Sequence, residues 1–332
     1  MEPLVEIKNL SIRFPEGNST FEAVKGISFS IGKGEIVGVV GESGSGKSMS
    51  ALALMGLLPK DAEIASGSLC FQGEDLVTMK PEKRRQLCGS KMAMVFQEPM
   101  TSLNPVLKIE RQVGESLRIH TKLGNAEIHE RVVQALSEVG LPDPEGLCGK
   151  YPHELSGGMR QRVMIAQAMI NSPSLLIADE PTTALDCVVQ AQILELLRNI
   201  HRTKGTSILF ISHDLNVVRA LCSRVIVVYK GEIVEEGQTE DVLLHPKHEY
   251  TKGLIRSIPR IDTKEHERLV PIEGSPVDLL NPPKGCPFAP RCEKCMKICL
   301  REMPPVTNFG EVHYTQCWLN QKEEMEKGAA NE

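Results

Sequence analysis

The chain has 332 residues, of which 41% are hydrophobic and 24% charged, and its formal net charge is −5. This length and apolar content predict two or three folding units with a full hydrophobic core, and the slightly acidic balance gives no reason to expect a nucleic-acid partner. No apolar run approaches the roughly 20 residues of a membrane-spanning helix, and the first residues lack the basic head and apolar core of a signal peptide, so we expect an intracellular protein that meets any membrane through a partner.

The first 60 residues predict antiparallel strands followed by a phosphate-binding loop. Residues 5–12 and 23–31 alternate apolar and polar side chains, as strands with one buried face do. Residues 35–40 are apolar from Ile36 onward, which is typical of a buried strand. Directly after it, residues 41–48 read Gly-Glu-Ser-Gly-Ser-Gly-Lys-Ser, and a helix is expected over 49–58. Strand, glycine-rich turn and helix are the context in which such a loop binds phosphate.

The residue types in this loop define its chemistry. The glycines let successive backbone N–H groups point inward, and the helix N-terminus adds the positive end of its dipole. Lys47 can then reach the terminal phosphates, and the Ser48 hydroxyl can ligate magnesium. The sequence therefore predicts a nucleoside triphosphate site. Phe14 lies near a polar turn in a chain that is only 4% aromatic, so it is a candidate for stacking on the base, although ordinary packing explains it equally well.

From about residue 81 the character of the chain changes. Charged residues cluster, helical periodicity appears in 126–141, and prolines interrupt the pattern, which predicts a mostly helical subdomain inserted at about 81–165. An apolar strand inside this range ends at Gln97. Near its close, Leu155-Ser156-Gly157-Gly158-Met159 stands at the start of a helix over 159–170, where backbone N–H groups can bind an anion.

Two further buried strands end in polar residues. An apolar run at 174–178 precedes Asp179 and Glu180, and another at 207–212 precedes His213. A carboxylate at a strand end beside a phosphate loop suits magnesium, and the next carboxylate suits the orientation of an attacking water. Ligands bind at the carboxyl ends of strands in α/β sheets, which gives His213 a significance that a lone histidine lacks. Residues 225–235 then predict a closing hairpin.

The C-terminal part is rich in proline and holds half of the ten cysteines. In a chain with no export signal, a local cysteine cluster is more typical of a metal site than of disulfides. Thiolates suit zinc or an iron–sulfur cluster, and chemistry alone favours zinc. The five clustered cysteines are Cys286, Cys292, Cys295, Cys299 and Cys317.

Over residues 1–250 these motifs resemble the nucleotide-binding subunits of ABC transporters. The matching segments are a Walker A loop at 41–48, a glutamine loop at Gln97, a signature at 155–159, a Walker B strand with its glutamate at 175–180, an aspartate loop at 184–186 and a switch histidine at His213. The resemblance implies an α/β P-loop NTPase core with an antiparallel β subdomain and the inserted helical subdomain. It also implies a head-to-tail dimer that holds ATP between the Walker A loop of one subunit and the signature of the other.

The same resemblance assigns roles to individual residues. Glu180 would be the catalytic base, His213 would hold the γ-phosphate, and Gln97 would also belong to the catalytic group. Magnesium would be ligated by Ser48, Gln97 and Asp179. The ATP-binding residues would be Phe14, Gly41, Ser43, Gly44, Gly46, Lys47, Ser48, Ser156, Gly157, Gly158 and Asp186, with Ser156, Gly157 and Gly158 acting across the dimer.

The remaining chain resembles the C-terminal extension of ATPase subunits from the dipeptide and oligopeptide importer branch. We therefore divide the chain into an ABC ATPase domain at 1–250 and a small cysteine-rich extension at 251–332. Members of that branch can carry a [4Fe–4S] cluster on four cysteines, and the spacing of Cys286, Cys292, Cys299 and Cys317 fits. Cys295 departs from the pattern because it lies inside the gap before Cys299. The resemblance thus favours a [4Fe–4S] cluster, with zinc as the alternative.

This family membership would make the chain a peripheral subunit on the cytoplasmic face of the cell membrane. It would hydrolyse ATP to drive peptide import through two transmembrane permease subunits, paired with a second, related ATPase or with a copy of itself. An external peptide-binding protein would deliver the cargo. Nickel or glutathione import remains an alternative, because other subunits choose the cargo. A soluble ABC ATPase acting on DNA, ribosomes or cluster assembly would show a coiled-coil insertion, a second cassette or a basic face, and the sequence has none of these.

Overall fold

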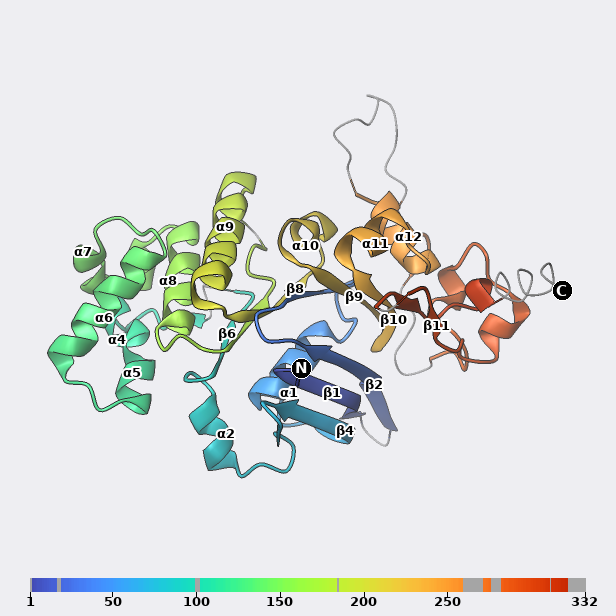
Figure 1. Cartoon of the computed structure of the whole chain (residues 1–332), viewed down its shortest axis with the longest axis horizontal. Helices are drawn as coiled ribbons and strands as arrows, with labels where there is room; N and C mark the ends of the chain where they lie inside the picture. Colours follow the sequence, from blue (N-terminus) through green and yellow to red (C-terminus); the bar gives the residue numbers. More distant parts are fainter. Residues whose placement is uncertain are drawn as a thin grey trace.

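The protein is organised around a central sheet of eight strands (Figure 1). The computed structural model describes residues 2–16, 19–98, 102–183, 185–258, 271–275, 282–310 and 312–321. In spatial order the strands are β11 (Thr307–Asn308), β12 (Tyr314–Thr315), β10 (Glu232–Gln238), β9 (Arg224–Tyr229), β3 (Ile36–Val40), β8 (Ser207–Ser212), β7 (Leu175–Asp179) and β6 (Met92–Val95).

The five strands from β9 to β6 run parallel, and the strands added beyond β9 are antiparallel. Every residue of β3, β7 and β8 is buried. Burial on both faces explains why their sequences are continuous apolar runs without alternation. The predicted strands at 35–40, 174–178 and 207–212 and the hairpin at 225–235 are therefore confirmed.

A second, antiparallel sheet covers one face of the central sheet. Its strands are β2 (Ser19–Ile31), β1 (Val5–Glu16), β4 (Glu63–Phe71) and β5 (Glu74–Asp75), in that order. The apolar side chains of β1 and β2 share one core with Val37, Val39 and helix α1 (Lys47–Met55). This confirms the predicted antiparallel strands ahead of the phosphate loop. In Figure 1, helices α9 (Cys187–Lys204), α10 (Leu215–Leu221), α11 (Thr239–Leu244) and α12 (Glu249–Arg256) lie on the opposite face.

The inserted helices form one end of the molecule, at the left of Figure 1. They are α4 (Ile109–Val113), α5 (Glu115–His120), α6 (Asn125–Glu138), α7 (Pro144–Cys148), the 3-10 helix η1 (Pro152–Glu154) and α8 (Gly157–Met169). The structure differs from the predicted range 81–165 at its start. Helix α2 (Pro81–Leu87) contacts α1 through Arg84, and β6 pairs with β7 in the central sheet. In the sequence, the charged residues of α2 are not separated from the insertion by any clear signal. In the structure, the inserted helices begin only after β6.

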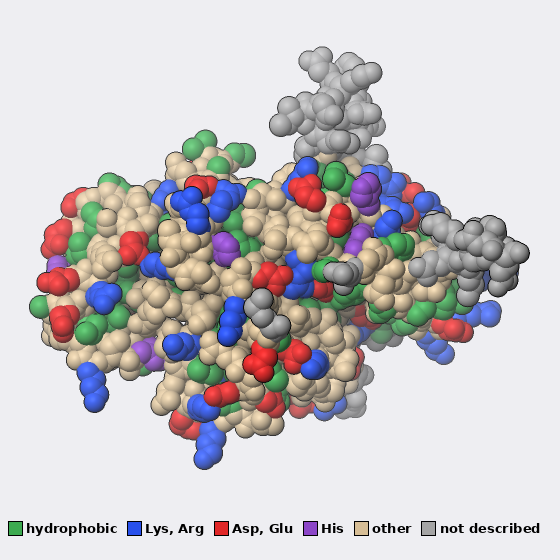
Figure 2. Space-filling view, viewed as in Figure 1, with side chains coloured by type: hydrophobic (Ala, Val, Ile, Leu, Met, Phe, Trp, Pro, Cys, Tyr) green, Lys and Arg blue, Asp and Glu red, His purple; other side chains and the backbone are tan. Residues whose placement is uncertain are grey.

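The described part of the C-terminal extension is attached to the central sheet. Its short 3-10 helices are η2 (Ala289–Arg291) and η3 (Lys297–Leu300), and its β12 strand pairs with β10. The extension thus adds strands to the nucleotide-binding core, and the proposed division at residue 250 stays a prediction. No helix in the described ranges is long and apolar enough to cross a membrane. On the face shown in Figure 2, acidic and basic side chains are interspersed, in keeping with the small net charge.

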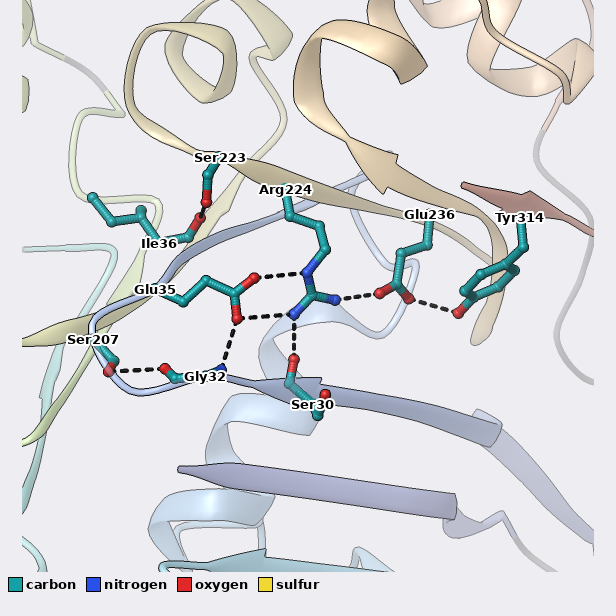
Figure 3. A network of polar contacts seen from close by, with 9 residues as sticks. All are labelled: Ser30, Gly32, Glu35, Ile36, Ser207, Ser223, Arg224, Glu236 and Tyr314. Atoms are coloured by element: carbon teal, nitrogen blue, oxygen red, sulfur yellow. Dashed lines mark hydrogen bonds and ion pairs between the residues drawn. The ribbon is translucent and has the colours of Figure 1, made fainter. Parts of the chain in front are cut away.

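A buried ion-pair network ties the two sheets and the extension together (Figure 3). Arg224 Nε lies 2.8 Å from Glu35 Oε1, and the same guanidinium pairs with Glu236 and donates to the Ser30 carbonyl. The Tyr314 hydroxyl donates to Glu236 Oε2 at 2.6 Å. Burial raises the pKa of Glu236, although Arg224 and Tyr314 oppose that rise. Arg224 of β9 is therefore linked directly to residues of β2 and β10 and, through Glu236, to Tyr314 of β12.

Replacing Arg224 by methionine should lower the free energy of unfolding by about 3 kcal/mol, because it leaves two carboxylates without their buried partner. Urea denaturation of the purified chain measures this loss. Arg219 is the matched control, since its side chain is 54% exposed and pairs with Glu240 at the surface. Arg219→Met should cost no more than about 1 kcal/mol. Equal losses for the two variants would contradict the prediction.

Candidate nucleotide-binding site

The phosphate loop turns sharply between β3 and α1, and sterics explain its glycines. Gly46 has a φ of 95°, in the left-handed region that favours glycine. A Cβ atom at Gly46 would lie 2.4 Å from the Ala23 carbonyl oxygen, and one at Gly41 would lie 2.1 Å from that of Val228. The loop therefore passes against the backbone of two strands, β2 and β9. Only glycine permits this path.

Lys47 lies inside the loop. Its Nζ donates to the carbonyl oxygens of Gly41 at 2.7 Å and Glu42 at 2.9 Å, and the residue is 5% exposed. Burial lowers the pKa of Lys47, while the nearby charges of Glu180, Asp179 and Glu42 oppose this shift. Ser43 and Gly44, at the tip of the loop, are exposed. A buried ammonium group beneath an exposed glycine-rich turn suits an anionic ligand.

Ser48 and Asp179 meet at the carboxyl end of β7. The Ser48 hydroxyl donates to Asp179 Oδ1 at 2.9 Å. Burial raises the pKa of Asp179, and the hydrogen bond from Ser48 opposes the rise. A hydroxyl and a carboxylate that converge beside a phosphate loop are oxygen ligands of the kind that Mg²⁺ prefers, so this pair fits the metal that the sequence predicts.

One carboxylate oxygen of Glu180 accepts three hydrogen bonds. Oε2 lies 3.0 Å from Gln97 Nε2, 3.0 Å from Thr183 Oγ1 and 3.2 Å from His213 Nδ1. The structure thus brings together Gln97, Glu180 and His213, which come from three separate segments of the sequence. Sequence reasoning missed Thr183, although it follows Glu180 by only three positions. In this arrangement Gln97 contacts Glu180 rather than the Ser48–Asp179 pair.

Three other predicted residues make local contacts among the described residues. The Ser156 hydroxyl caps α8 by accepting from the Met159 amide, and Asp186 caps α9 through the Val188 and Val189 amides. The Phe14 ring stacks on Phe21 across β1 and β2, with centroids 5.3 Å apart. Ala184, in the predicted aspartate loop, lies outside the described residues.

The two signature glycines differ in their surroundings. A Cβ at Gly158 would lie 2.9 Å from Val189 Cγ1, so packing against α9 explains that glycine. A Cβ at Gly157 would meet no atom within 4 Å, so no contact in the described structure requires a glycine there. The N-terminus of α8 is therefore open at Gly157, where its backbone N–H groups remain accessible to a ligand.

Four of the five clustered C-terminal cysteines lie together, and the fifth lies apart from them. Cys286, Cys292, Cys299 and Cys317 line one small cavity, whereas Cys295 is exposed and does not line it. Burial raises the pKa of Cys292 to about 11, and the neighbouring thiols add to the rise. No group of three or more histidine, cysteine or acidic side chains in the described parts of the chain is arranged to hold a metal ion. The structure therefore gathers the four predicted ligands without itself showing a metal site.

Comparison with known protein families gives two matches. The family model for ABC transporters matches residues 24–183, and the model for the oligopeptide/dipeptide transporter C-terminal region matches residues 234–299.

Curated relatives match almost the whole chain. The dipeptide transport ATP-binding protein DppD of Bacillus subtilis is 45% identical over 320 residues, covering 96% of this chain and 95% of the relative. The oligopeptide transport ATP-binding protein OppD of the same organism is 44% identical over 317 residues, covering 95% and 88%. Among solved structures, the ATP-binding cassette MJ0796, in a dimeric post-hydrolysis state bound to ADP and Pi, has a TM-score of 0.65 and 28% identity, covering 71% of this chain and 98% of that one.

Proposed function

This chain belongs to the ATP-binding subunits of ABC transporters, in the dipeptide and oligopeptide branch, and from that premise we propose how its residues use ATP. The protein is an ATPase that energises peptide import through partner permease subunits. The observation that carries the proposed chemistry is the placement of Lys47, the Ser48–Asp179 pair and Glu180 at one edge of the central sheet. Parallel strands present their ligand sites at that edge.

We assign ATP to the phosphate loop, with Ser43 and the glycine amides around the phosphates and Lys47 neutralising their charge. Ser48 and Asp179 would hold Mg²⁺, with Gln97 as a third ligand; bound there, the ion neutralises charge on the β- and γ-phosphates. Glu180 orients a water and accepts its proton as the water oxygen bonds to the γ-phosphorus and the bond to the β–γ bridging oxygen breaks. His213 steadies the γ-phosphate, and Phe14 stacks on the adenine.

We further propose that the site is completed by a partner subunit, through Ser156, Gly157 and Gly158. Support comes from the open α8 N-terminus at Gly157 and from the dimeric state named for the solved relative. Asp186, as the cap of α9, would help to position the opposing loop at the same interface. The partner is either a copy of this chain or a second, related ATPase.

A mixing experiment tests the composite site. Lys47→Ala and Ser156→Arg should each reduce ATP hydrolysis to background in isolation, because each disables both sites of a homodimer. An equimolar mixture should recover about a quarter of the wild-type rate, since half of the random dimers retain one intact site of two. Phosphate release measures this recovery.

The assignment across the dimer fails if an active wild-type homodimer shows no recovery in the mixture. An inactive wild-type chain would instead point to an obligate pair with a different ATPase. In that case each variant, combined with the wild-type partner ATPase in the assembled transporter, should disable one of the two sites, and Lys47→Ala and Ser156→Arg should disable different ones.

The inserted helices are the proposed contact with two permease subunits. Val106 and Ile119, in this region, are 75% and 68% exposed, which suits apolar docking. The subunit would then lie peripherally on the cytoplasmic face of the membrane, and an external binding protein would deliver the cargo. The names of the relatives favour peptides over nickel or glutathione. Purification of the whole transporter, with identification of its permeases and bound cargo, distinguishes these cargoes.

We also propose a [4Fe–4S] cluster on Cys286, Cys292, Cys299 and Cys317, with zinc as the alternative. The four thiols line one cavity and Cys295 does not, which supports this choice of ligands. A thiol-lined cavity suits either metal centre, because both take thiolate ligands. Bound there, the group would supply the cross-links that order the extension.

A further inference from the structure

The C-terminal extension contacts the phosphate loop directly. Arg291 Nη1 lies 2.8 Å from Glu42 Oε2, and Nη2 lies 3.1 Å from Glu42 Oε1. This is a bidentate ion pair between residues 249 positions apart in the sequence. Glu42 is the second residue of the phosphate loop, and Arg291 precedes Cys292 of the thiol-lined cavity. The pair therefore joins the cysteine-rich segment to the loop that binds ATP.

Contacts within the extension fix the guanidinium group of Arg291. The Arg291 side chain is 4% exposed. Its remaining N–H groups donate to the carbonyl oxygens of Ile272 at 3.3 Å and Glu273 at 3.1 Å. Burial opposes its charge, but hydrogen bonds to Glu42 and Tyr229 outweigh that cost and hold the pKa of Arg291 above its usual value. Because the Arg291 guanidinium group is fixed by several hydrogen bonds, it holds the Glu42 carboxylate in one orientation.

A second contact holds the backbone of the same residue. The Glu42 amide donates to the Tyr250 hydroxyl at 2.8 Å. Tyr250 is fully buried, and its ring lies 4.6 Å from that of Tyr229 and 5.4 Å from that of Phe288, which stands next to η2. The extension thus holds the Glu42 side chain through Arg291, and Tyr250 of α12, which packs against Phe288 of the extension, holds the Glu42 amide.

The charge of Glu42 affects ATP binding, because this residue lies in the phosphate loop. Glu42 places a carboxylate inside a loop that must bind a triphosphate, and an unpaired carboxylate there would repel the ligand. The bidentate contact with Arg291 cancels that charge. Because the Glu42 carbonyl also accepts from Lys47 Nζ at 2.9 Å, the position of Glu42 is coupled to that of the phosphate-binding ammonium group.

We propose that Arg291 and Tyr250 are positioning residues for the phosphate loop, so that an ordered C-terminal extension is required for tight ATP binding. The proposal rests on the assignment of ATP to this loop. It makes ATP binding and ordering of the 286–292 segment reciprocal: each stabilises the other by the same free energy.

Equilibrium binding of Mg-ATP to the full-length chain tests the role of Arg291. Arg291→Met should weaken binding about 10-fold, within the range of a typical coupling between sites. Arg256→Met is the matched control, because Arg256 pairs with Glu293 of the extension at the surface and does not contact Glu42. It should bind ATP as the wild type does. Tyr250→Phe keeps the buried ring and removes only the hydroxyl, and it should weaken binding about 3-fold.

The double variant separates positioning from a general loss of structure. Adding Glu42→Gln to Arg291→Met removes the unpaired carboxylate, so it should recover most of the lost affinity. Hydrogen exchange supplies a second readout. Mg-ATP should slow exchange of the amides in 286–292 in the wild type and in Arg256→Met, but not in Arg291→Met.

The outcomes distinguish this proposal from the assignment of ATP itself. If Lys47→Ala binds Mg-ATP normally, the assignment of ATP to the loop fails. If Lys47→Ala loses binding while Arg291→Met and Tyr250→Phe bind normally, only the positioning role is overturned. It is also overturned if the losses for Glu42→Gln and Arg291→Met simply add, because independent effects would then explain both.

Discussion

Glu180→Gln is expected to abolish ATP turnover and leave ATP binding intact. Glutamine keeps the size of the side chain but cannot take a proton from the attacking water, and loss of a general base costs about 100- to 10,000-fold in rate. In the proposed mechanism, binding depends instead on Lys47, Ser48 and the loop amides. The variant should therefore accumulate as an ATP-bound dimer. Phosphate release, Mg-ATP affinity and size-exclusion chromatography with ATP measure the three effects.

Two further variants sharpen this test. Thr183→Val removes one of the three hydrogen bonds to Glu180 Oε2 and leaves the carboxylate in place, so it should slow turnover much less than Glu180→Gln. Glu240→Gln changes an exposed carboxylate that pairs with Arg219 and should have no effect on the rate. Wild-type turnover in Glu180→Gln would remove Glu180 from the role of base.

The sequence predicts the central strands well because burial leaves a strong signal. The runs at β3, β7 and β8 are mostly apolar, with polar residues only at the ends of β7 and β8, and each is buried on both faces. The strands β11 and β12 have two residues each, too few to show a period. They form because β10 offers a free edge and because Glu236 accepts from Tyr314, a contact between residues 78 positions apart.

The residues of the nucleotide site also differ in how well the sequence predicts them. The phosphate loop is contiguous, so residue order alone predicts the roles of Lys47 and Ser48. Gln97, Glu180 and His213 are distant in the chain, but each follows a strand of the parallel sheet, and topology brings them together. Arg291 ends the 3-10 helix η2, which has only three residues and is too short to show a period. Its contact with Glu42 depends on how the extension folds back over the core, which no local pattern encodes.

The thiol-lined cavity leads to the second large expected effect. Cys299→Ser should release the proposed metal centre and leave the extension unfolded, because the short elements η2, η3, β11 and β12 bury little apolar surface by themselves. Binding free energies of structural metal sites, on the order of 10 kcal/mol, exceed what such a segment can supply from packing. Hydrogen exchange over residues 286–317 measures the unfolding. ATP should still bind at Lys47, with an affinity reduced no further than in Arg291→Met.

Cys295→Ser is the matched control for the ligand set, because this thiol is exposed and lies outside the cavity. It should retain the metal centre and the protection of the extension. Iron and acid-labile sulfide analysis of anaerobically purified protein should give about four of each per chain for the wild type and for Cys295→Ser, and less in Cys299→Ser. One zinc ion without sulfide would replace the cluster by a zinc site on the same four thiols. Loss of iron in Cys295→Ser alone would contradict the ligand choice, since the cavity would then not be the site that holds the metal.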